Sequence, residues 1–216
     1  DVNRDPLAWT NGITLTGWAR EINPLAVTDG QNDYSGNNGF LGAEDNSGFH
    51  NVGADGDSER ALGFIGRDDD SYPAALTLTF RNISGATIDS FDLSYTGEQW
   101  FRSAYPVNLE FQYAIGSAVS ASPLDETPSW VDVNALDFVP LETGNNREMN
   151  GNEAANQSLL SVSNIAISLP PEDFITFRWS YPGPIGITGT GMFVDDVSVN
   201  FSGSGSGSEV TDGIVY

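Results

Sequence analysis

The chain contains no cysteine and no lysine, and only one histidine occurs among its 216 residues. Without cysteine no disulfide frames the fold, so stability must come from core packing, with bound metal as one further source. Without lysine an intramolecular Lys–Asn isopeptide staple is excluded. The eight basic residues are all arginine and face 30 acidic residues, for a net charge of -22. Because counterion release requires basic side chains, a nucleic-acid partner is not expected.

Long hydrophobic runs are also missing, since no apolar stretch approaches the roughly 20 residues that a membrane span needs. We therefore expect no membrane insertion. Apolar and polar residues instead alternate in short runs between turns rich in Gly, Asn, Asp, Ser and Pro, which is typical of strands buried on one face. The clearest runs are residues 13–18, 75–80, 88–96, 107–115, 159–169, 175–179 and 192–201.

These runs predict an all-β domain over residues 1–201, a length that suits one β-sandwich with a substantial core. Residues 29–59 are dense in Gly, Asn and Asp, and we expect long loops there, anchored by Phe40, Leu41 and Phe49. Residues 152–158 are polar and could hold one helical turn.

The C-terminal end departs from this pattern. Residues 202–208 alternate Ser and Gly, which indicates an engineered flexible linker, and residues 209–216 then form a tethered β-strand peptide. Val210, Asp212, Ile214 and Tyr216 share one face at a period of two, as in a strand that seeks an open sheet edge. A natural Gly/Ser tail or a cloning remnant is the alternative.

Several motifs together resemble a family of bacterial extracellular jelly-roll domains found in secreted or surface-anchored proteins. The most specific is Tyr-Thr-Gly-Glu-Gln-Trp at 95–100, and the closing strand with Asp-Asp-Val-Ser at 195–198 is shared with MAM-like jelly rolls. The remaining motifs lie at 58–63, 109–113, 136–138, 150–156 and 177–179. The resemblance implies a jelly-roll β-sandwich of two antiparallel sheets and an extracellular or cell-surface location.

Members of that family usually begin with a further strand, and nothing occupies that place here, so the domain is expected to be one strand short. The tethered peptide would fill such a gap, as in self-complemented subunits of fibres assembled by donor-strand exchange. The leading hypothesis is therefore a non-enzymatic structural subunit that exchanges strands with neighbouring copies of itself. The alternatives are a carbohydrate-binding accessory module of a secreted enzyme or adhesin, and a peptide-capturing adhesin domain.

Catalytic signals are weak. His50 lies in a Gly/Asn-rich segment without a Gly-x-Ser-x-Gly elbow to serve. Glu98 and Glu110 could form a glycosidase carboxylate pair, but 30 acidic residues make such pairs common. A structural role for Glu98 as a buried acceptor, with Arg102 or Arg178 as its partner, is the preferred interpretation.

Calcium is the one cofactor that the sequence suggests, because hard cations prefer carboxylate and carbonyl oxygens. The candidate ligands are Asp195 and Asp196 on the closing strand, and Asp55 and Asp57 in an acidic loop. Neighbouring residues on a strand point to opposite faces, so one of Asp195 and Asp196 should face the core. Solvated acidic loops are the alternative.

Glycans are a second candidate partner, recognised by exposed aromatic side chains. Trp100, Phe101 and Tyr105 form the most plausible exposed cluster in the sequence. Aromatic residues within sandwich strands more often belong to the core, and this is the expectation for Trp179.

Overall fold

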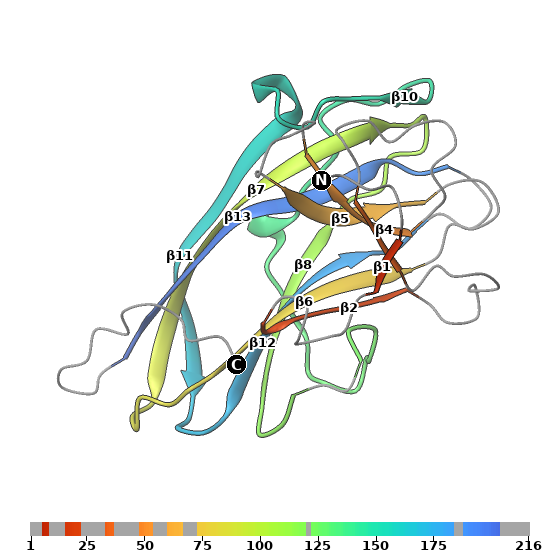
Figure 1. Ribbon diagram of the computed structural model, residues 1–216. Coiled ribbons are helices and arrows are strands. Elements are labelled where there is room, and N and C mark those ends of the chain that lie inside the picture. Colours follow the sequence, from red (N-terminus) through yellow and green to blue (C-terminus); the bar gives the residue numbers. More distant parts are fainter. Residues whose placement is uncertain are drawn as a thin grey trace.

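The computed structural model of the chain describes residues 6–8, 16–22, 33–36, 48–53, 60–66, 73–119, 122–183 and 188–203. Within these residues the chain folds into two stacked β-sheets (Figure 1). The only helical elements among them are two single 3-10 turns, η3 (Asn134–Leu136) and η4 (Ala154–Asn156). None of the described helices is long and apolar enough to cross a membrane.

The first sheet has eight strands in the order β1-β3-β4-β5-β13-β7-β10, and β11 also pairs with β7. Its strands are β1 (Pro6–Ala8), β3 (Asp33–Gly36), β4 (Gly48–Val52), β5 (Ala61–Ile65), β7 (Ile88–Arg102), β10 (Arg147–Glu148), β11 (Gln157–Leu169) and β13 (Gly191–Ser202). All pairs are antiparallel except the short parallel pair of β3 with β4.

The second sheet has five antiparallel strands in the order β2-β6-β12-β8-β9. They are β2 (Trp18–Ile22), β6 (Ala74–Arg81), β12 (Phe174–Tyr181), β8 (Glu110–Gly116) and β9 (Val131–Asp132). Strand order follows sequence order in neither sheet, so the chain crosses repeatedly between the two layers. The predicted all-β jelly-roll sandwich of two antiparallel sheets is thereby confirmed.

Alternation along the strands places an aromatic core between the two sheets. On β12, Ile175, Phe177 and Trp179 point inward and are fully buried. The Trp179 ring stacks on Trp18 at 5.6 Å between ring centroids and meets the edge of Tyr95 at 5.6 Å. Such offset and edge-to-face arrangements suit the quadrupoles of the rings. The expectation that Trp179 belongs to the core is confirmed.

A second, smaller apolar cluster lies on the outer face of the eight-stranded sheet, away from the core between the sheets. Its members are Val52, Ala61, Ile65, Trp100, Phe101 and Phe193. Gly63 of β5 belongs to this packing, because a Cβ there would come within 2.2 Å of the Met192 carbonyl oxygen and 2.8 Å of the Phe193 ring. Glycine therefore lets β5 approach β13 closely.

Some predicted boundaries were wrong. The loops expected at 29–59 contain the strands β3 and β4, although Phe49 is the buried anchor that the sequence suggested. The predicted strand at 13–18 is represented by β2, which begins at Trp18; residues 9–15 lie outside the described part. The helical turn expected at 152–158 is present as η4. Strand β13 extends through Ser202, one residue into the predicted linker.

Candidate functional site

A segment after β8, of which residues 117–119 and 122–130 are described, lies over the outer face of the five-stranded sheet. The alternation that points Phe177 and Trp179 into the core turns Thr176 and Arg178 to this outer face. The same rule turns Gln112 and Ala114 of β8 outward beside them, because Arg178 pairs with Gln112 and Thr176 with Ala114 across the two strands.

Arg178 holds this segment against the sheet. Its guanidinium is almost fully buried and donates from Nε to Gln112 Oε1 at 2.8 Å. It also donates from Nη1 to Glu126 Oε1 at 2.8 Å, and at 3.4 Å to the carbonyl oxygens of Pro123 and Asp125. Because these acceptors come from both β8 and the 122–130 segment, a single arginine joins the sheet to the segment that covers it.

The ring of Trp130 is fixed from two sides. The guanidinium carbon of Arg178 lies 3.9 Å from the ring centroid, a close cation–π contact. The indole Nε1 donates to the Asp125 carbonyl oxygen at 2.9 Å. Asp125 in turn accepts from the backbone N–H and the hydroxyl of Thr127, both at 2.9 Å, which forms a tight polar turn. The ring is therefore preorganised rather than free to rotate.

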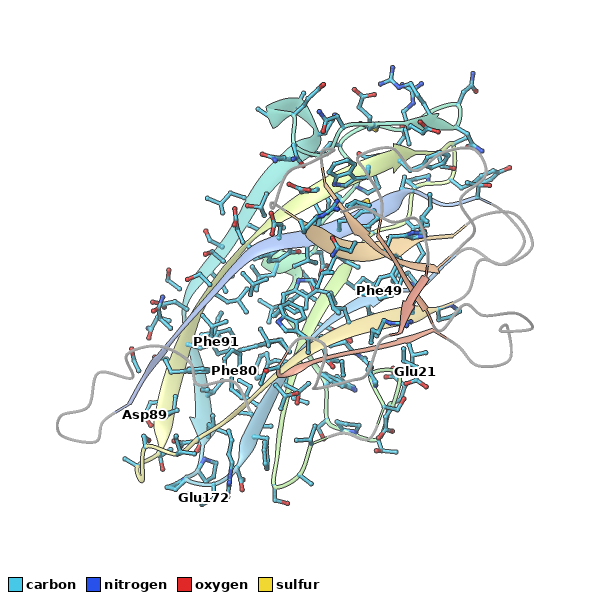
Figure 2. The ribbon with its side chains drawn as sticks, viewed as in Figure 1. Glu21, Phe49, Phe80, Asp89, Phe91 and Glu172 are labelled. Carbon is cyan, nitrogen blue, oxygen red and sulfur yellow. The ribbon has the colours of Figure 1, made fainter. Side chains whose placement is uncertain are left out.

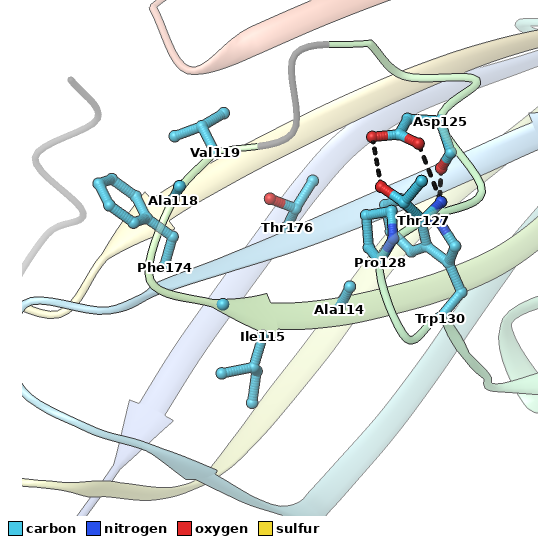
Figure 3. A pocket seen from close by; sticks show the side chains of 11 residues that line it. Ala114, Ile115, Ala118, Val119, Asp125, Thr127, Pro128, Trp130, Phe174 and Thr176 are labelled. Carbon is cyan, nitrogen blue, oxygen red and sulfur yellow. Dashed lines mark hydrogen bonds between the residues drawn. The ribbon is translucent and has the colours of Figure 1, made fainter.

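Between this segment and the sheet lies a cleft of about 310 Å³ (Figure 3). It is lined by small, aromatic and polar residues: Ala114, Ile115, Gly116, Ala118, Val119, Asp125, Thr127, Pro128, Trp130, Phe174 and Thr176. In the close-up, Phe174 and Trp130 lie at opposite ends, and Ala114 and Thr176 lie between them.

The lining combines two kinds of surface. The partly buried rings of Trp130 and Phe174 offer apolar faces, while Asp125 and Thr127 supply oxygen atoms that can accept or donate hydrogen bonds. Among the described residues of the lining, Asp125 alone is charged. This chemistry suits a ligand that is apolar on one face and rich in hydroxyl groups at its edge.

The predicted glycan cluster is largely wrong as an exposed surface. Trp100 is completely buried and Phe101 is 4% exposed, whereas Tyr105 is 53% exposed. Trp100 is covered by the turn before η4, where a Cβ on Gly151 would come within 2.0 Å of the indole nitrogen. Trp100 and Phe101 therefore belong to the outer apolar cluster rather than to an exposed surface.

Glu98 is the buried acceptor that the sequence predicted, but its partners are not arginines. It accepts from Trp100 Nε1 at 2.8 Å and from Gln157 Nε2 at 3.0 Å. Burial raises the pKa of Glu98, the charges of Asp195 and Asp196 raise it further, and these two hydrogen bonds oppose the rise.

A glycosidase pair of Glu98 and Glu110 does not form. Glu98 belongs to the outer face of the eight-stranded sheet, beside Trp100. Glu110 of β8 lies in the other sheet, where burial, then Asp137 and Asp132, raise its pKa and Arg178 lowers it. Because the two carboxyl groups lie on different sheets and face away from each other, they cannot flank one glycosidic bond.

His50 is placed on β4, opposite Gly63, and is buried. Burial on a central strand of the sheet agrees with the low expectation of a catalytic role.

The calcium ligands are not brought together within the described residues, where no group of three acidic or histidine side chains converges. Asp196 is exposed, with φ of +49°, and a register shift separates Asp195 from Ser198, so a bulge replaces the simple alternation expected there. Asp195 is half-buried and pairs with Thr96. Asp55 and Asp57 lie outside the described residues, and calcium binding stays a prediction.

The peptide residues Val210, Asp212, Ile214 and Tyr216 also lie outside the described residues. Sequence reasoning missed the cleft itself. The available signal was Trp130 in a loop with two prolines, Pro123 and Pro128, because an aromatic residue in a polar loop has no strand core to enter.

No family model matches the sequence, and no curated protein matches it. Among solved structures, TmCBM61 in complex with beta-1,4-galactotriose is 12% identical over 84% of this chain and 86% of that chain, with a TM-score of 0.42. The enzymatically active domain of tailspike protein 4 of bacteriophage CBA120 is 9% identical over 93% of this chain and 21% of that chain, with a TM-score of 0.40. The CBM22-1–GH10 modules of a Clostridium thermocellum xylanase, complexed with xylohexaose, are 10% identical over 90% of this chain and 28% of that chain, with a TM-score of 0.34. Such distant similarities do not bear on what this chain binds.

Proposed function

We propose that the chain is a non-catalytic, extracellular glycan-binding module and that the cleft binds a neutral oligosaccharide. The observation that carries this proposal is the pair of aromatic rings, Trp130 and Phe174, at the two ends of a cleft with small residues between them. A sugar ring is apolar on its faces and polar at its rim, so it complements aromatic walls and the adjacent Thr127 and Asp125 oxygens.

The negative charge of the protein and of its cleft determines which glycans are expected to bind. The chain carries a net charge of -22, and Asp125 is the charged residue that lines the cleft. An anionic sugar would therefore meet a repulsive potential. Arg178 adds little positive potential, because its guanidinium, held against Trp130, is already ion-paired with Glu126. The proposed ligand is therefore uncharged, and the proposed context is an accessory module of a secreted enzyme or adhesin.

The fibre-subunit hypothesis depends on residues 209–216, which lie outside the described residues. It stays a prediction and does not conflict with glycan binding, since the cleft is formed by the five-stranded sheet and its covering segment.

Isothermal titration calorimetry with a panel of neutral oligosaccharides and matched uronic-acid oligosaccharides tests the proposal. We expect binding of at least one neutral ligand and none of its anionic counterpart. Replacing Trp130 or Phe174 by Ala should weaken binding at least about tenfold, the effect of losing one good apolar contact. Tyr105→Ala is the matched control, because Tyr105 is an exposed aromatic residue outside the cleft lining.

Thermal unfolding of each variant separates loss of the site from loss of the fold. The proposal is overturned if the parent protein binds no neutral oligosaccharide at millimolar concentration. It is equally overturned if Tyr105→Ala abolishes binding while both cleft variants, correctly folded, keep it.

A further inference from the structure

The closing strand β13 is paired on both sides along only part of its length. Met192, Phe193 and Val194 lie between β5 and β7, with Val194 opposite Leu62 on the β5 side. From Ser198 to Ser202 the strand pairs with β7, and within the described residues it has no second neighbour. One edge of this half of β13 is therefore open in the described part of the chain.

The open edge follows from where β5 begins. The last residue of β5 that pairs with β13 is Leu62, and β5 itself begins one residue before it, at Ala61. The pairing of the two strands therefore ends there. The bulge at Asp196 then shifts the side-chain alternation of the residues that follow it in β13. Unpaired N–H and C=O groups along an apolar strand edge favour the addition of another strand.

The core-facing side chains in this half of β13 are themselves incompletely covered. Met192 and Val194 are fully or almost fully buried, whereas Val197, Val199 and Phe201 pack against the same core and are only partly buried. The Phe201 ring lies 5.5 Å from Phe80 and 6.4 Å from Phe177, between ring centroids. Figure 2 shows Phe80 and Phe91 between the two sheets near this end of the sandwich. An added strand would cover apolar surface here as well as satisfy backbone groups.

We propose that this edge of β13, residues 197–202, accepts residues 209–216 of the same chain as an additional antiparallel strand. Only the six residues 203–208 separate the two segments, and all are Gly or Ser. Adjacent strands lie about 4.8 Å apart, so a flexible loop of this length returns easily to the edge it has just left. Such a return produces the antiparallel direction of a hairpin.

Alternation fixes which face of the peptide turns inward. Residues directly opposite each other in an antiparallel pair lie on the same face of the sheet. A register with Val210 opposite Phe201 puts Asp212 opposite Val199 and Ile214 opposite Val197, so two large aliphatic side chains and one carboxylate turn toward the apolar surface. The other parity would turn Glu209, Thr211, Gly213 and Val215 inward, which offers that surface only one large aliphatic side chain. Outward positions of the edge are Ser198, Asn200 and Ser202, which carry no charge.

A second open edge offers the competing location. Strand β11 pairs only with β7 among the described residues. To reach the free side of β11 from Ser202, the peptide must pass β7 and β11. That is three strand spacings, or about 14 Å. A linker of this length can extend to about 20 Å, so reach alone does not decide. The adjacent edge and the incompletely covered Val197, Val199 and Phe201 favour β13.

Paired cysteines test the location, since the chain contains no cysteine of its own. Asn200→Cys with Thr211→Cys places two outward side chains opposite each other in the proposed register. Ser161→Cys with Thr211→Cys is the matched control, because Ser161 is an exposed position on β11. After mild oxidation, we expect peptide mapping to show an intramolecular 200–211 disulfide in most molecules and little of the 161–211 disulfide.

Preferential 161–211 bridging would place the peptide on β11 and overturn the proposal. A disulfide-linked dimer would assign the edge to the peptide of a second copy, which also overturns it.

Hydrogen exchange supplies a measurement that does not depend on the engineered cysteines. Truncation after Gly203 should speed amide exchange in residues 197–202 at least tenfold and leave β12 unchanged. Free peptide of residues 209–216 should restore protection only at millimolar concentration, since a short tether provides an effective concentration in that range. Unchanged exchange after truncation would mean that another segment covers the edge, and the proposal would fail. Glycan binding should survive truncation, so the two proposals can fail separately.

Discussion

Replacing Arg178 by Met should destabilise the domain and release the segment that forms one wall of the cleft. Methionine keeps much of the apolar stem but removes every hydrogen bond of the guanidinium. The side chain of Arg178 is 3% exposed, so solvent cannot replace the lost donors.

The cost can be worked out from the contacts. The bond from Nε to Gln112 Oε1 at 2.8 Å is charge-assisted and contributes about 1.5–3 kcal/mol. The cation–π contact with Trp130 at 3.9 Å adds about 1–2 kcal/mol. The ion pair with Glu126 counts for less than about 1 kcal/mol, because the Glu126 side chain is 74% exposed. The carbonyl contacts at 3.4 Å are long and weak. Together these contributions predict a loss of about 2.5–6 kcal/mol.

Urea unfolding measures this loss as a shift of the midpoint at constant slope. Arg81→Met is the matched control. Arg81 lies on the neighbouring strand β6 and pairs with Glu172, but the two side chains are 49% and 63% exposed, so the expected loss is below about 1 kcal/mol. If both variants lose less than about 1 kcal/mol, Arg178 does not hold the segment, and the account of a preorganised Trp130 is wrong.

Three further outcomes are expected. Gly151→Ala should cost about 1–3 kcal/mol in urea unfolding, because the new Cβ would come within 2.0 Å of the Trp100 indole, whereas Gly116→Ala, with its nearest contact at 3.6 Å, should be nearly neutral. Tyr95→Phe should cost about 1 kcal/mol, since the hydroxyl donates to a buried carbonyl oxygen at 2.5 Å; equal stability would show that this bond contributes nothing. The stability of Glu98→Gln relative to the parent should rise as pH increases through the raised native pKa of Glu98, because the parent must then ionise a buried carboxyl, even though the new amide nitrogen cannot accept one of the two hydrogen bonds; parallel pH–stability curves for variant and parent would contradict this.

Strand periodicity predicted the fold well where one face is buried. β6, β7, β12 and β13 alternate apolar and polar residues along much of their length, and they form the centres of the two sheets. The strands that periodicity missed are buried differently. β5 is buried at all five positions because the core lies on one side and the Trp100 cluster on the other, so its sequence has no period to detect. β4 is short and lies in a Gly- and Asn-rich segment, whose composition favours turns.

The Tyr-Thr-Gly-Glu-Gln-Trp motif illustrates why specific residues can mislead about function. Tyr95 and Gln99 hold residues 136–142 against β7, Tyr95 through the Leu136 carbonyl and Gln99 through the backbone of Leu141 and Glu142. Gly97 makes room for the Phe138 ring, since a Cβ would lie 2.5 Å from it. Each of these roles concerns packing. Trp100 of this motif was predicted to belong to an exposed glycan-binding cluster, and only the three-dimensional contacts reveal its structural role.

The same reasoning explains where a glycan site can form in this molecule. A sandwich whose strands carry many aromatic residues uses most of them between its sheets, as Trp18, Trp179 and Phe177 do. The outer apolar cluster takes Trp100 and Phe101. Among the described residues, aromatic faces remain available where a loop or a strand end carries them, as at Tyr105, Trp130 and Phe174. Tyr105 is not part of the cleft lining, whereas Trp130 and Phe174 face the same cleft, and the buried Arg178 fixes the position of Trp130. The positions that alternation leaves to loops and strand ends therefore form the proposed binding surface.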